Sequence, residues 1–564
     1  MTLEPQSAPA TATSAADPIW FASYPPGVPG SIDPDSYASL PAMLVETCAR
    51  HAGLPAFECL GARMSYAEWD HASRAFAAFL IEEAKCRPGD RVAIMLPNLL
   101  AYPVAFFGAL RAGLTVVNVN PLYTPRELKE QLADSGAVAI VIMENFAHKL
   151  ESVLAETQIR HVVVARLGDF MPILKRLLFN AVNTYVRHAV PRWHFDTFTM
   201  LHDACVRRPS ARYADAQPGA MTAALLQYTG GTTGVPKGAV LTHRNLVANA
   251  LQCRAWIEPN LGKEQGRVLT PLPLYHIFSL TANLLAFALM GGMSVLVPDP
   301  RDIKRLIQTM RRAQVSTMTG VNTLFNALLN APDFAALDFS KLSFAIGGGA
   351  AVQSAVATRW RHVTGTDLVE GYGLSEASPV VCINPVRSPR IGTVGLPVSS
   401  TEVSIRDESG RPVAVGEAGE ICVRGPQVMQ GYWRRPDETA KVLIGGWLHT
   451  GDIGALDPQG YLKILDRKKD MVNVSGFKVF PNEVEDVIAQ HPGVLEAAVI
   501  GVPDQHTGQA VKLFVVRRDP ALEAAELVKY SRERLAGYKV PRAIEFVDSL
   551  PKSNIGKIIR KDLK

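Results

Sequence analysis

The stretch Tyr228–Asn245, with the sequence YTGGTTGVPKGAVLTHRN, decides the fold class of this chain. It follows the apolar segment 223–227, whose composition is typical of a buried strand. Its glycines allow a tight turn that presents backbone N–H groups to an anion, while its threonines and Lys237 add hydroxyl donors and a positive charge. An ordinary surface loop rich in glycine and threonine is the alternative. The residues predicted to bind phosphate are Thr229, Gly230, Gly231, Thr232, Thr233, Gly234 and Lys237.

Two common nucleotide-binding loops do not match this sequence. A Walker A loop requires Gly-Lys-Ser/Thr after four free positions, but Pro236 precedes Lys237 and Gly238 follows it. The strand-like segment 342–346 leads into three glycines at 347–349, which differ from the Gly-x-Gly-x-x-Gly pattern of dinucleotide-binding folds. The phosphate loop therefore does not indicate a Walker A protein, and the glycines at 347–349 do not indicate a dinucleotide-binding fold.

The composition limits the size class and the partners of the chain. With 564 residues it is too long for a single core, and 48% hydrophobic and 20% charged residues are ordinary for a globular protein. The net charge of +5, from 58 basic and 53 acidic residues, is too mild to predict a nucleic-acid partner. Seven scattered cysteines without a Cys-x-x-Cys pair predict reduced thiols rather than a zinc site or disulfides. Because residues 1–18 lack an apolar signal region, we expect a cytoplasmic protein.

Strand-like and helix-like segments alternate through the first two-thirds of the chain. Ser65-Tyr-Ala-Glu68 has the pattern of a capping box, which predicts an amphipathic helix to about Ala84. This alternation predicts α/β layers with largely parallel sheets. The predicted apolar strands lie at 91–96, 115–119, 137–143, 223–227, 267–270, 294–297 and 342–346.

The pattern changes near residue 390, where glycines, prolines and short alternating strands predict a β-rich subdomain. After the charged segment 466–470, a compact strand–helix–strand–strand pattern predicts a small α+β domain. We therefore expect a disordered or extended N-terminal tail at 1–34, followed by a large multi-subdomain part at 35–466. This large part combines two α/β layered subdomains with the β-rich one, and a small α+β domain at 467–564 follows it.

Two segments have features of membrane-interacting sequences. Residues 277–297 carry no charge over 21 positions, but Gly291-Gly292 divides them, so we expect a buried helix, a turn and a buried strand. Residues 173–193 place apolar side chains at helical spacing with only basic charges. This second segment predicts either a basic amphipathic helix on a membrane surface, making a peripheral contact with the inner face of the cell membrane, or a surface helix packed on the core.

Five further motifs follow the phosphate loop: 273–276, 347–349, 370–376, 447–452 and 550–557. With these motifs in this order, the chain after about residue 35 resembles the acyl-adenylate-forming (AMP-binding) superfamily. That superfamily includes acyl-CoA synthetases, luciferase-like enzymes and the adenylation domains of peptide synthetases. The resemblance implies an adenylation domain at 35–466 and a mobile C-terminal domain at 467–564, with ATP and Mg²⁺ as cofactors and coenzyme A as co-substrate.

Four charged residues of these motifs suit the chemistry of adenylation. A carboxylate beside a triphosphate is repelled unless a cation intervenes, so Glu376 is predicted to be a catalytic residue that ligates Mg²⁺. Asp452 resembles the ribose ligand of the superfamily, and Arg467 supplies a guanidinium for ribose or phosphate oxygens. The resemblance identifies Lys557 as the mobile catalytic lysine, which offsets repulsion between the substrate carboxylate and the α-phosphate. Solvated linker and tail charges are the alternatives for Arg467 and Lys557.

The resemblance also implies the remaining roles. His276 is placed at the carboxylate end of the acyl pocket as a third catalytic residue, and a histidine of the core is its alternative. Lys469 is placed at the hinge between the domains, and the segment 474–477 is expected to flank the pantetheine of coenzyme A. The full set expected to bind ATP or coenzyme A outside the phosphate loop is Gly348, Gly349, Glu370, Gly371, Tyr372, Gly373, Ser375, Asp452, Arg467, Lys469 and Gly476.

Within the superfamily, the runs 272–278, 319–328, 466–470 and 537–541 look like the branch of bacterial long-chain-fatty-acid–CoA ligases. This implies activation of a long-chain fatty acid to its acyl-adenylate and transfer to coenzyme A, with release of pyrophosphate and AMP. The same chemistry on a medium-chain, short-chain, aryl or amino acid is one alternative. A binding scaffold that has lost catalysis is another, against which the retained charged residues argue. The sequence leaves chain length and a homodimer open.

Overall fold

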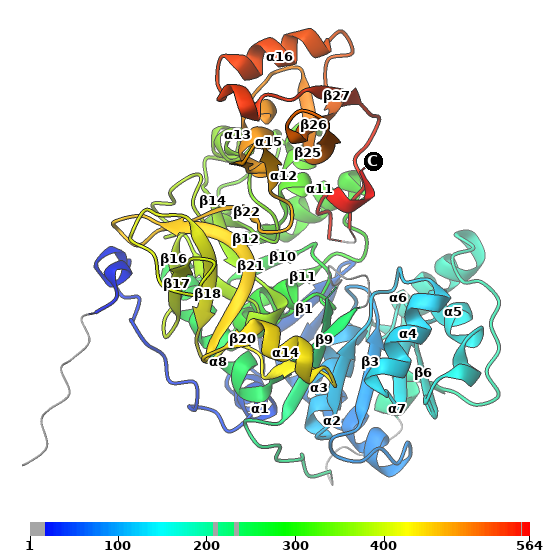
Figure 1. Cartoon of the computed structure of the whole chain (residues 1–564). Helices are drawn as coiled ribbons and strands as arrows, with labels where there is room; N and C mark the ends of the chain where they lie inside the picture. Colours follow the sequence, from blue (N-terminus) through cyan, green and yellow to red (C-terminus); the bar gives the residue numbers. More distant parts are fainter. Residues whose placement is uncertain (1–16, 207–212, 230–235, 554, 564) are drawn as a thin grey trace, which may run out of the picture.

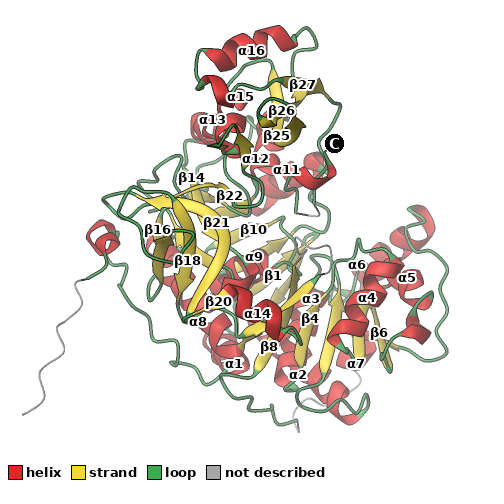
Figure 2. Cartoon of the chain, viewed as in Figure 1, coloured by secondary structure: helices red, strands yellow, loops and turns green. Residues whose placement is uncertain are grey.

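The computed structural model describes residues 17–206, 213–229, 236–553 and 555–563. Two large sheets and a smaller β-rich sheet form the main body, and a small domain with its own sheet lies on top of them (Figures 1 and 2). This arrangement confirms the predicted fold class, an α/β protein with a β-rich subdomain and a small α+β C-terminal domain.

One large sheet has eight strands in the order β19-β9-β8-β4-β3-β5-β6-β7. Its strands from β8 to β7 are parallel, and the edge strands β9 and β19 are antiparallel. Most of their residues are buried, as expected when helices cover both faces of a parallel sheet. The strands are β3 (Arg91–Met95), β4 (Thr115–Asn118), β5 (Ala139–Met143), β6 (His161–Ala165), β7 (Thr199–Met200), β8 (Ala223–Thr229), β9 (Lys237–Thr242) and β19 (Gly431–Tyr432).

The other large sheet has nine strands in the order β16-β15-β14-β13-β12-β10-β11-β1-β2. Its centre from β14 to β1 is parallel, and antiparallel pairs close both ends. The prediction of largely parallel sheets is therefore confirmed. The strands are β1 (Pro55–Cys59), β2 (Ala62–Ser65), β10 (Arg267–Thr270), β11 (Met293–Leu296), β12 (Thr317–Gly320), β13 (Phe344–Gly347), β14 (Leu368–Gly373), β15 (Val380–Ile383) and β16 (Leu396–Pro397).

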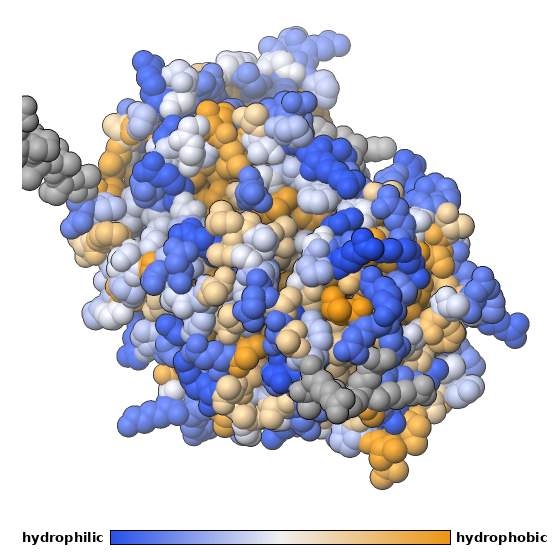
Figure 3. All heavy atoms as spheres, turned by 90° about the horizontal axis from the view of Figure 1, so that it is seen from below, coloured by the Kyte–Doolittle hydropathy of each residue, from blue (hydrophilic) through white to orange (hydrophobic). Residues whose placement is uncertain are grey.

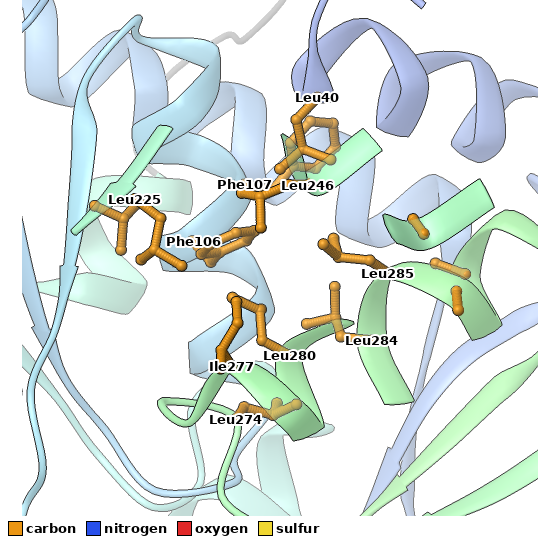
Figure 4. Close-up of a cluster of buried hydrophobic side chains, with 14 of the residues drawn as sticks. Leu40, Phe106, Phe107, Leu225, Leu246, Leu274, Ile277, Leu280, Leu284 and Leu285 are labelled. Carbon is orange, nitrogen blue, oxygen red and sulfur yellow. The ribbon is translucent and has the colours of Figure 1, made fainter. Parts of the chain in front are cut away.

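Helices from distant parts of the chain form a shared core between these sheets. Figure 4 shows Phe106 and Phe107 of α3 (Ala101–Arg111) gathered with Leu40 of α1 (Leu40–Arg50) and Leu246 of α8 (His243–Ile257). All four side chains are fully buried. Phe107 also packs against α2 (Tyr66–Glu82) through a ring contact with Trp69. The predicted capping box is present at the start of α2, where the side chains of Ser65 and Glu68 each bond the other's backbone N–H.

The segment 277–297 folds as predicted from its glycine pair. It forms α9 (Ile277–Ser279), a π-helical turn (Leu280–Leu285), α10 (Ala286–Leu289) and then β11, and nearly all of it is buried. Within the described residues, no helix has both the length and the apolar character that crossing a bilayer requires. The segment therefore belongs to the core.

The predicted helix within 173–193 is present as α6 (Ile173–Ala181), but its apolar side chains are not covered by the core. Ile173, Leu174, Leu177 and Leu178 are all more than half exposed. Only Phe179 of this helix packs, half-buried, against the core. The face of the protein seen from below in Figure 3 shows hydrophilic side chains interspersed with hydrophobic ones.

The remaining helices of the main body cover the sheets or lie at their ends. They are α4 (Pro125–Ser135), α5 (Ala147–Glu151), α7 (Leu201–Val206), α11 (Ile303–Ala313), α12 (Asn322–Asn330), α13 (Ser354–Thr364) and α14 (Pro436–Val442).

The β-rich sheet follows the second large sheet and receives the N-terminal segment. Its strands are β17 (Glu402–Arg406), β18 (Gly419–Arg424), β20 (Leu443–Ile444), β21 (Trp447–Leu456) and β22 (Leu462–Arg467). Residues 17–34 pack against the segment just before this sheet. Trp20 is buried, the Tyr24 hydroxyl donates to the Pro397 carbonyl at 2.5 Å, and the Ile32 N–H donates to Ser400 Oγ. Part of the segment expected to be a tail is therefore packed.

The C-terminal domain has a core of its own. Its elements are β23 (Val472–Val474), β24 (Phe477–Val479), α15 (Pro481–Ala489), β25 (Val494–Asp504), β26 (Gly508–Arg517), α16 (Ala524–Arg532) and β27 (Ala543–Phe546). The last two strands of the predicted strand–helix–strand–strand pattern are β25 and β26, which pair antiparallel over their whole length. The pattern analysis missed β24, α16 and β27, which are short and mostly polar at their exposed positions.

Candidate active site

A pocket opens where the ends of β13 and β14 meet the segment that begins at His276. About 660 Å³ inside it, including its open mouth, is free of protein atoms. Its walls are mainly apolar, with His276, Tyr372 and Ser375 among its polar members. The apolar walls are formed by Cys253, Trp256, Ile257, Ile277, Phe278, Ala282, Ile346, Leu374, Pro379, Val380, Cys382, Ile383 and Val398. Such a pocket accepts an apolar group and holds its polar end beside a few polar side chains.

The glycines predicted from the motifs shape one wall of this pocket. Gly348, Gly349, Gly371 and Gly373 all line it. A Cβ on Gly348 would lie 3.1 Å from the Phe278 ring, and one on Gly373 would overlap the Pro379 carbonyl oxygen. Glycine is thus needed at Gly373, where an added Cβ would meet backbone, and at Gly348 its absence of a side chain allows the Phe278 ring to approach closely.

Tyr372, Asp452 and Arg467 meet at one side of the pocket. The hydroxyl of Tyr372, on β14, donates to Asp452 Oδ2 at 2.6 Å, and Arg467 Nε lies 3.6 Å from Asp452 Oδ1. Asp452 and Arg467 are direct neighbours on the antiparallel pair β21 and β22. Burial raises the pKa of Asp452, although Arg467 and the Tyr372 hydroxyl favour its ionised form. The Asp452 carboxylate is therefore fixed in position. Further hydrogen-bond donors from a bound molecule would stabilise its ionised form.

Lys557 enters the same region from the C-terminal domain. Burial, together with repulsion from Arg467, lowers the pKa of Lys557 to about 8, while Asp452 opposes that shift. His276 is close enough for the Lys557 charge to add to the effect of burial, and the pKa of His276 falls to about 4. The Nδ1 atom of His276 accepts the Phe278 N–H at 3.3 Å. His276 is therefore neutral near pH 7, with its orientation set by the start of α9.

Glu376 and Lys237 both interact with Tyr432, Glu376 with its hydroxyl group and Lys237 with its ring. The Tyr432 hydroxyl donates to Glu376 Oε1 at 2.8 Å, and the Lys237 ammonium lies 5.4 Å from the centre of the Tyr432 ring. Lys237 also forms an ion pair with Glu438 of α14. Thr229 faces Lys237 across the antiparallel pair β8 and β9. The other predicted members of the phosphate loop, Gly230, Gly231, Thr232, Thr233 and Gly234, lie outside the described residues.

The Glu376 carboxylate suits a hard metal ion whose other ligands come from a bound molecule. In the described parts of the chain, no group of three or more His, Cys, Asp and Glu side chains is placed to hold a metal ion. Glu376 is half-buried, and in the same parts Tyr432 is the one residue whose side chain donates to its carboxylate. A carboxylate of this kind suits Mg²⁺, which is commonly bound by one or two carboxylates plus phosphate oxygens.

Like Asp452, Arg467 and Lys557, the predicted residues Glu370, Lys469 and Gly476 do not line the pocket itself. Glu370 is not part of its lining, since its carboxyl group accepts the Val352 N–H at 3.0 Å, and burial raises its pKa to about 8. Lys469 is exposed in the short connection between β22 and β23. Gly476 lies in an exposed turn with φ +87°, where its N–H donates to Asn473 Oδ1. In this arrangement of the two domains, Lys557 thus lies within electrostatic reach of His276 and Asp452, and no residue of the 474–477 turn lines the pocket.

Two residues of the site, Tyr432 and Glu438, were not predicted from the sequence. Tyr432 connects Glu376 with Lys237, and Glu438 pairs with Lys237, but both follow the phosphate loop by about 200 positions. No local pattern around Gly431-Tyr432-Trp433 indicated a site. The pairing of β19 with β9 brings Tyr432 there.

Comparisons with known proteins agree over both domains. The family model described as AMP-binding enzyme matches residues 44–433, and that of the AMP-binding enzyme C-terminal domain matches residues 483–557. A long-chain-fatty-acid–CoA ligase of Escherichia coli O157:H7 is 51% identical, over 97% of this chain and 98% of the relative. A feruloyl-CoA synthase of Amycolatopsis sp is 35% identical, over 89% of this chain and 94% of the relative.

Two solved structures share the arrangement of the whole chain. The anthranilate CoA ligase AuaEII in complex with anthranoyl-AMP has a TM-score of 0.84 at 26% identity, covering 94% of this chain and 98% of that one. ATP-bound MatB from Rhodopseudomonas palustris has a TM-score of 0.81 at 27% identity, covering 93% and 98%. The chain belongs to the AMP-binding enzyme family.

Proposed function

We propose that this protein is a long-chain-fatty-acid–CoA ligase. In the first step, a carboxylate oxygen of the fatty acid attacks the α-phosphorus of ATP, and pyrophosphate leaves. In the second step, the sulfur of coenzyme A attacks the acyl carbon, the thiol proton is lost, and AMP leaves. The observation that carries the proposal is an apolar pocket whose lining residue Tyr372 donates a hydrogen bond to Asp452, with the Lys557 ammonium within electrostatic reach of Asp452 and of His276.

The residues of the pocket divide the work of the first step. The Lys557 ammonium lies between two anionic reactants, where it offsets their repulsion and stabilises the charge of the transition state. Asp452 and Arg467 hold the ribose, and the flat glycine wall at 348–349 leaves room for the adenine. Neutral His276 borders the carboxylate end without adding charge.

Glu376 would hold a magnesium ion in this scheme, together with oxygen atoms of the phosphates. When bound, it neutralises part of the triphosphate charge. Lys237 and Thr229 lie at the two ends of the phosphate loop and would contact the same phosphates. The Tyr432 hydroxyl orients Glu376 toward this position.

The second step requires a different arrangement of the C-terminal domain. We infer that the domain rotates about Lys469, which withdraws Lys557 and brings the turn 474–477 to the pocket. Two features support this: Lys469 lies in the connection after β22, and the turn is exposed with open space around Gly476. Phe477 is also largely exposed, although its ring stacks on that of Tyr538 at 4.8 Å between ring centres.

The nature of the acid is tested by a panel of substrates. The lining is apolar and combines aliphatic with aromatic side chains, so it suits an apolar acid, and the Escherichia coli relative is named for a long-chain fatty acid. Two of the relatives above are instead named for anthranilate and ferulate. We expect AMP release with coenzyme A to be fastest for palmitate or oleate and slow for octanoate, benzoate and ferulate. A preference for an aryl acid would replace the fatty acid in the proposal, and no AMP release with any acid would refute it.

We also propose that the exposed face of α6 contacts the inner surface of the membrane from the cytoplasm. Leu174 is 80% exposed and Leu178 is 61% exposed, so the helix presents an apolar stripe to the surroundings. The charged residues of the segment 173–193 are all basic. The Lys175 ammonium donates to the Gly61 carbonyl in the turn between β1 and β2, and the Arg312 guanidinium also lies near Gly61. Apolar stripes with basic borders bind anionic bilayers, and a fatty acid substrate partitions into the same phase.

Vesicle flotation tests this contact. We expect the protein to float with vesicles containing phosphatidylglycerol, and the Leu174→Glu/Leu178→Glu variant to lose that binding. Leu122→Glu, a substitution at an exposed leucine elsewhere, is the matched control and keeps it. Absence of flotation by the unmodified protein removes the proposal. If light scattering instead shows a dimer that the double variant dissociates, the stripe is a homodimer interface.

A further inference from the structure

The C-terminal domain rests on the main body along a short polar seam. The Thr323 hydroxyl donates to the Gly556 carbonyl at 2.8 Å, and the Asn326 amide donates to the Leu495 carbonyl at 3.0 Å. At the other end, the backbone N–H and hydroxyl of Ser354 both donate to Asp486 Oδ1 at 3.0 Å. We call Thr323, Asn326 and Ser354 the polar seam. All three belong to the main body, and each partner belongs to the small domain.

The geometry of two helices creates this seam. Thr323 and Asn326 stand three positions apart on α12, so they lie on the same side of that helix. Ser354 is the first residue of α13 and faces α15 through Asp486. Neither Thr323 nor Asn326 lines the pocket. The face of α12 that carries them therefore serves the contact between domains rather than the acyl site.

Thr323 acts directly on the loop that carries the catalytic lysine. Gly556 immediately precedes Lys557, and a Cβ on Gly556 would lie 2.8 Å from Thr323 Oγ1. Gly556 also has φ +85°, a conformation that side chains rarely adopt. The contact thus depends on glycine for both space and backbone geometry, so α12 and the lysine loop are closely fitted here.

The loop is also tied to itself around Lys557. The Lys557 N–H donates to Ser553 Oγ at 3.1 Å, and the Ser553 N–H donates to the Lys557 carbonyl at 2.7 Å. Lys552 and Ile558 form a bridge just outside this pair, so the two chain segments that flank the loop are paired with each other. Holding Gly556 in place therefore also limits where Lys557 is positioned.

We propose that Thr323 is a positioning residue for the adenylation step, which docks the Lys557 loop against the main body. The proposal rests on the proposed ligase function. The hydroxyl makes its contact in the arrangement that places Lys557 in the pocket, and domain rotation breaks that contact. Its loss therefore slows formation of the acyl-adenylate and spares the transfer to coenzyme A.

Two half-reactions measured separately test this role in the Thr323→Val variant. Valine keeps the β-branched shape and removes the donor. We expect single-turnover formation of palmitoyl-adenylate to fall about 3- to 10-fold, as for loss of one hydrogen bond. Conversion of preformed palmitoyl-adenylate to palmitoyl-CoA is expected to be unchanged or faster. Thr323→Ser restores the hydroxyl and should recover most of the rate.

The matched control is Thr358→Val on α13. The Thr358 hydroxyl donates to the Ser354 carbonyl of its own helix at 2.9 Å, and within the described part of the small domain no residue forms a hydrogen bond with it. This variant should leave both half-reactions unchanged. An unchanged adenylation rate in Thr323→Val overturns the proposal, as does an equal fall in both half-reactions, because that result indicates a structural role. If the unmodified protein forms no adenylate from any acid, the ligase function fails instead.

Discussion

Replacing Asp452 with asparagine tests the ribose site with little change in shape. The two oxygens of Asp452 have different neighbours, the Tyr372 hydroxyl at 2.6 Å and Arg467 Nε at 3.6 Å. An asparagine keeps its oxygen toward one neighbour and turns its amide N–H₂ toward the other. It therefore presents one acceptor where the carboxylate presents two, and it carries no charge.

The size of the effect follows from these contacts. Hydrogen bonds to a charged group contribute about 1.5–3 kcal/mol and those between neutral groups about 0.5–1.5 kcal/mol. Two ribose hydroxyls donating to Asp452 therefore lose about 2 kcal/mol together, which corresponds to a roughly 30-fold weaker binding of ATP. Arg467 is 47% exposed, so water solvates its guanidinium when the partner charge is gone.

The thermal stability of the Asp452→Asn variant should not fall with its affinity for ATP. Burial raises the pKa of Asp452 above its value in the unfolded chain. The folded protein then binds more protons than the unfolded chain above the unfolded pKa, so ionisation of this group lowers stability as pH rises. Asparagine removes that cost, and we expect a Tm at pH 7.5 equal to or slightly above that of the unmodified protein.

The assay is pyrophosphate exchange with increasing ATP at saturating palmitate, together with thermal unfolding. Asp196→Asn, which makes the same change at a fully exposed carboxylate, is the control and should alter neither measurement. A rise in KM for ATP of less than about threefold would refute the assigned role of Asp452. A rise that merely parallels loss of folded protein would refute it as well.

Three further predictions follow from the same geometry. Lys557→Ala should lower the rate of adenylation about 10²- to 10³-fold, the cost of one lost transition-state contact. Since the pKa of Lys557 is about 8, kcat/KM for adenylation should be constant below that value and fall about tenfold per pH unit above it, as the ammonium loses its proton. Gly373→Ala should destabilise the protein by about 3 kcal/mol or more in urea unfolding, because the new Cβ overlaps the Pro379 carbonyl oxygen.

Each of these predictions has its own control and contrary result. Lys557→Ala should still convert preformed adenylate to acyl-CoA, and wild-type adenylation by this variant would contradict the role of Lys557. The same transfer step serves as control for the pH profile, and an adenylation rate that stays level through pH 9 would contradict that prediction. Gly262→Ala, where no atom lies within 4 Å of the added Cβ, is the control for Gly373→Ala. Equal stability of these two variants would contradict the steric argument.

Local patterns predicted much of the architecture. The capping box at Ser65, the glycine break at 291–292 and the strand at 223–227 are each decided by residues within one or two turns of the chain. Their side-chain periodicity and backbone preferences act over the same short range, so a single sequence suffices. The exposed face of α6 is a different case, because periodicity predicted the helix but did not show whether the core covers it.

The sequence by itself determined the alternation of strands and helices, the β-rich segment after residue 390 and the residue types able to bind a nucleotide. Only the tertiary structure decided which of those residues meet. Tyr372 and Asp452 are 80 positions apart, and Glu376 and Tyr432 are 56 apart. Strand order and the docking of the small domain bring such pairs together, and both depend on packing summed over the whole chain. Periodicity, which is a local property, carries no information about those long-range contacts.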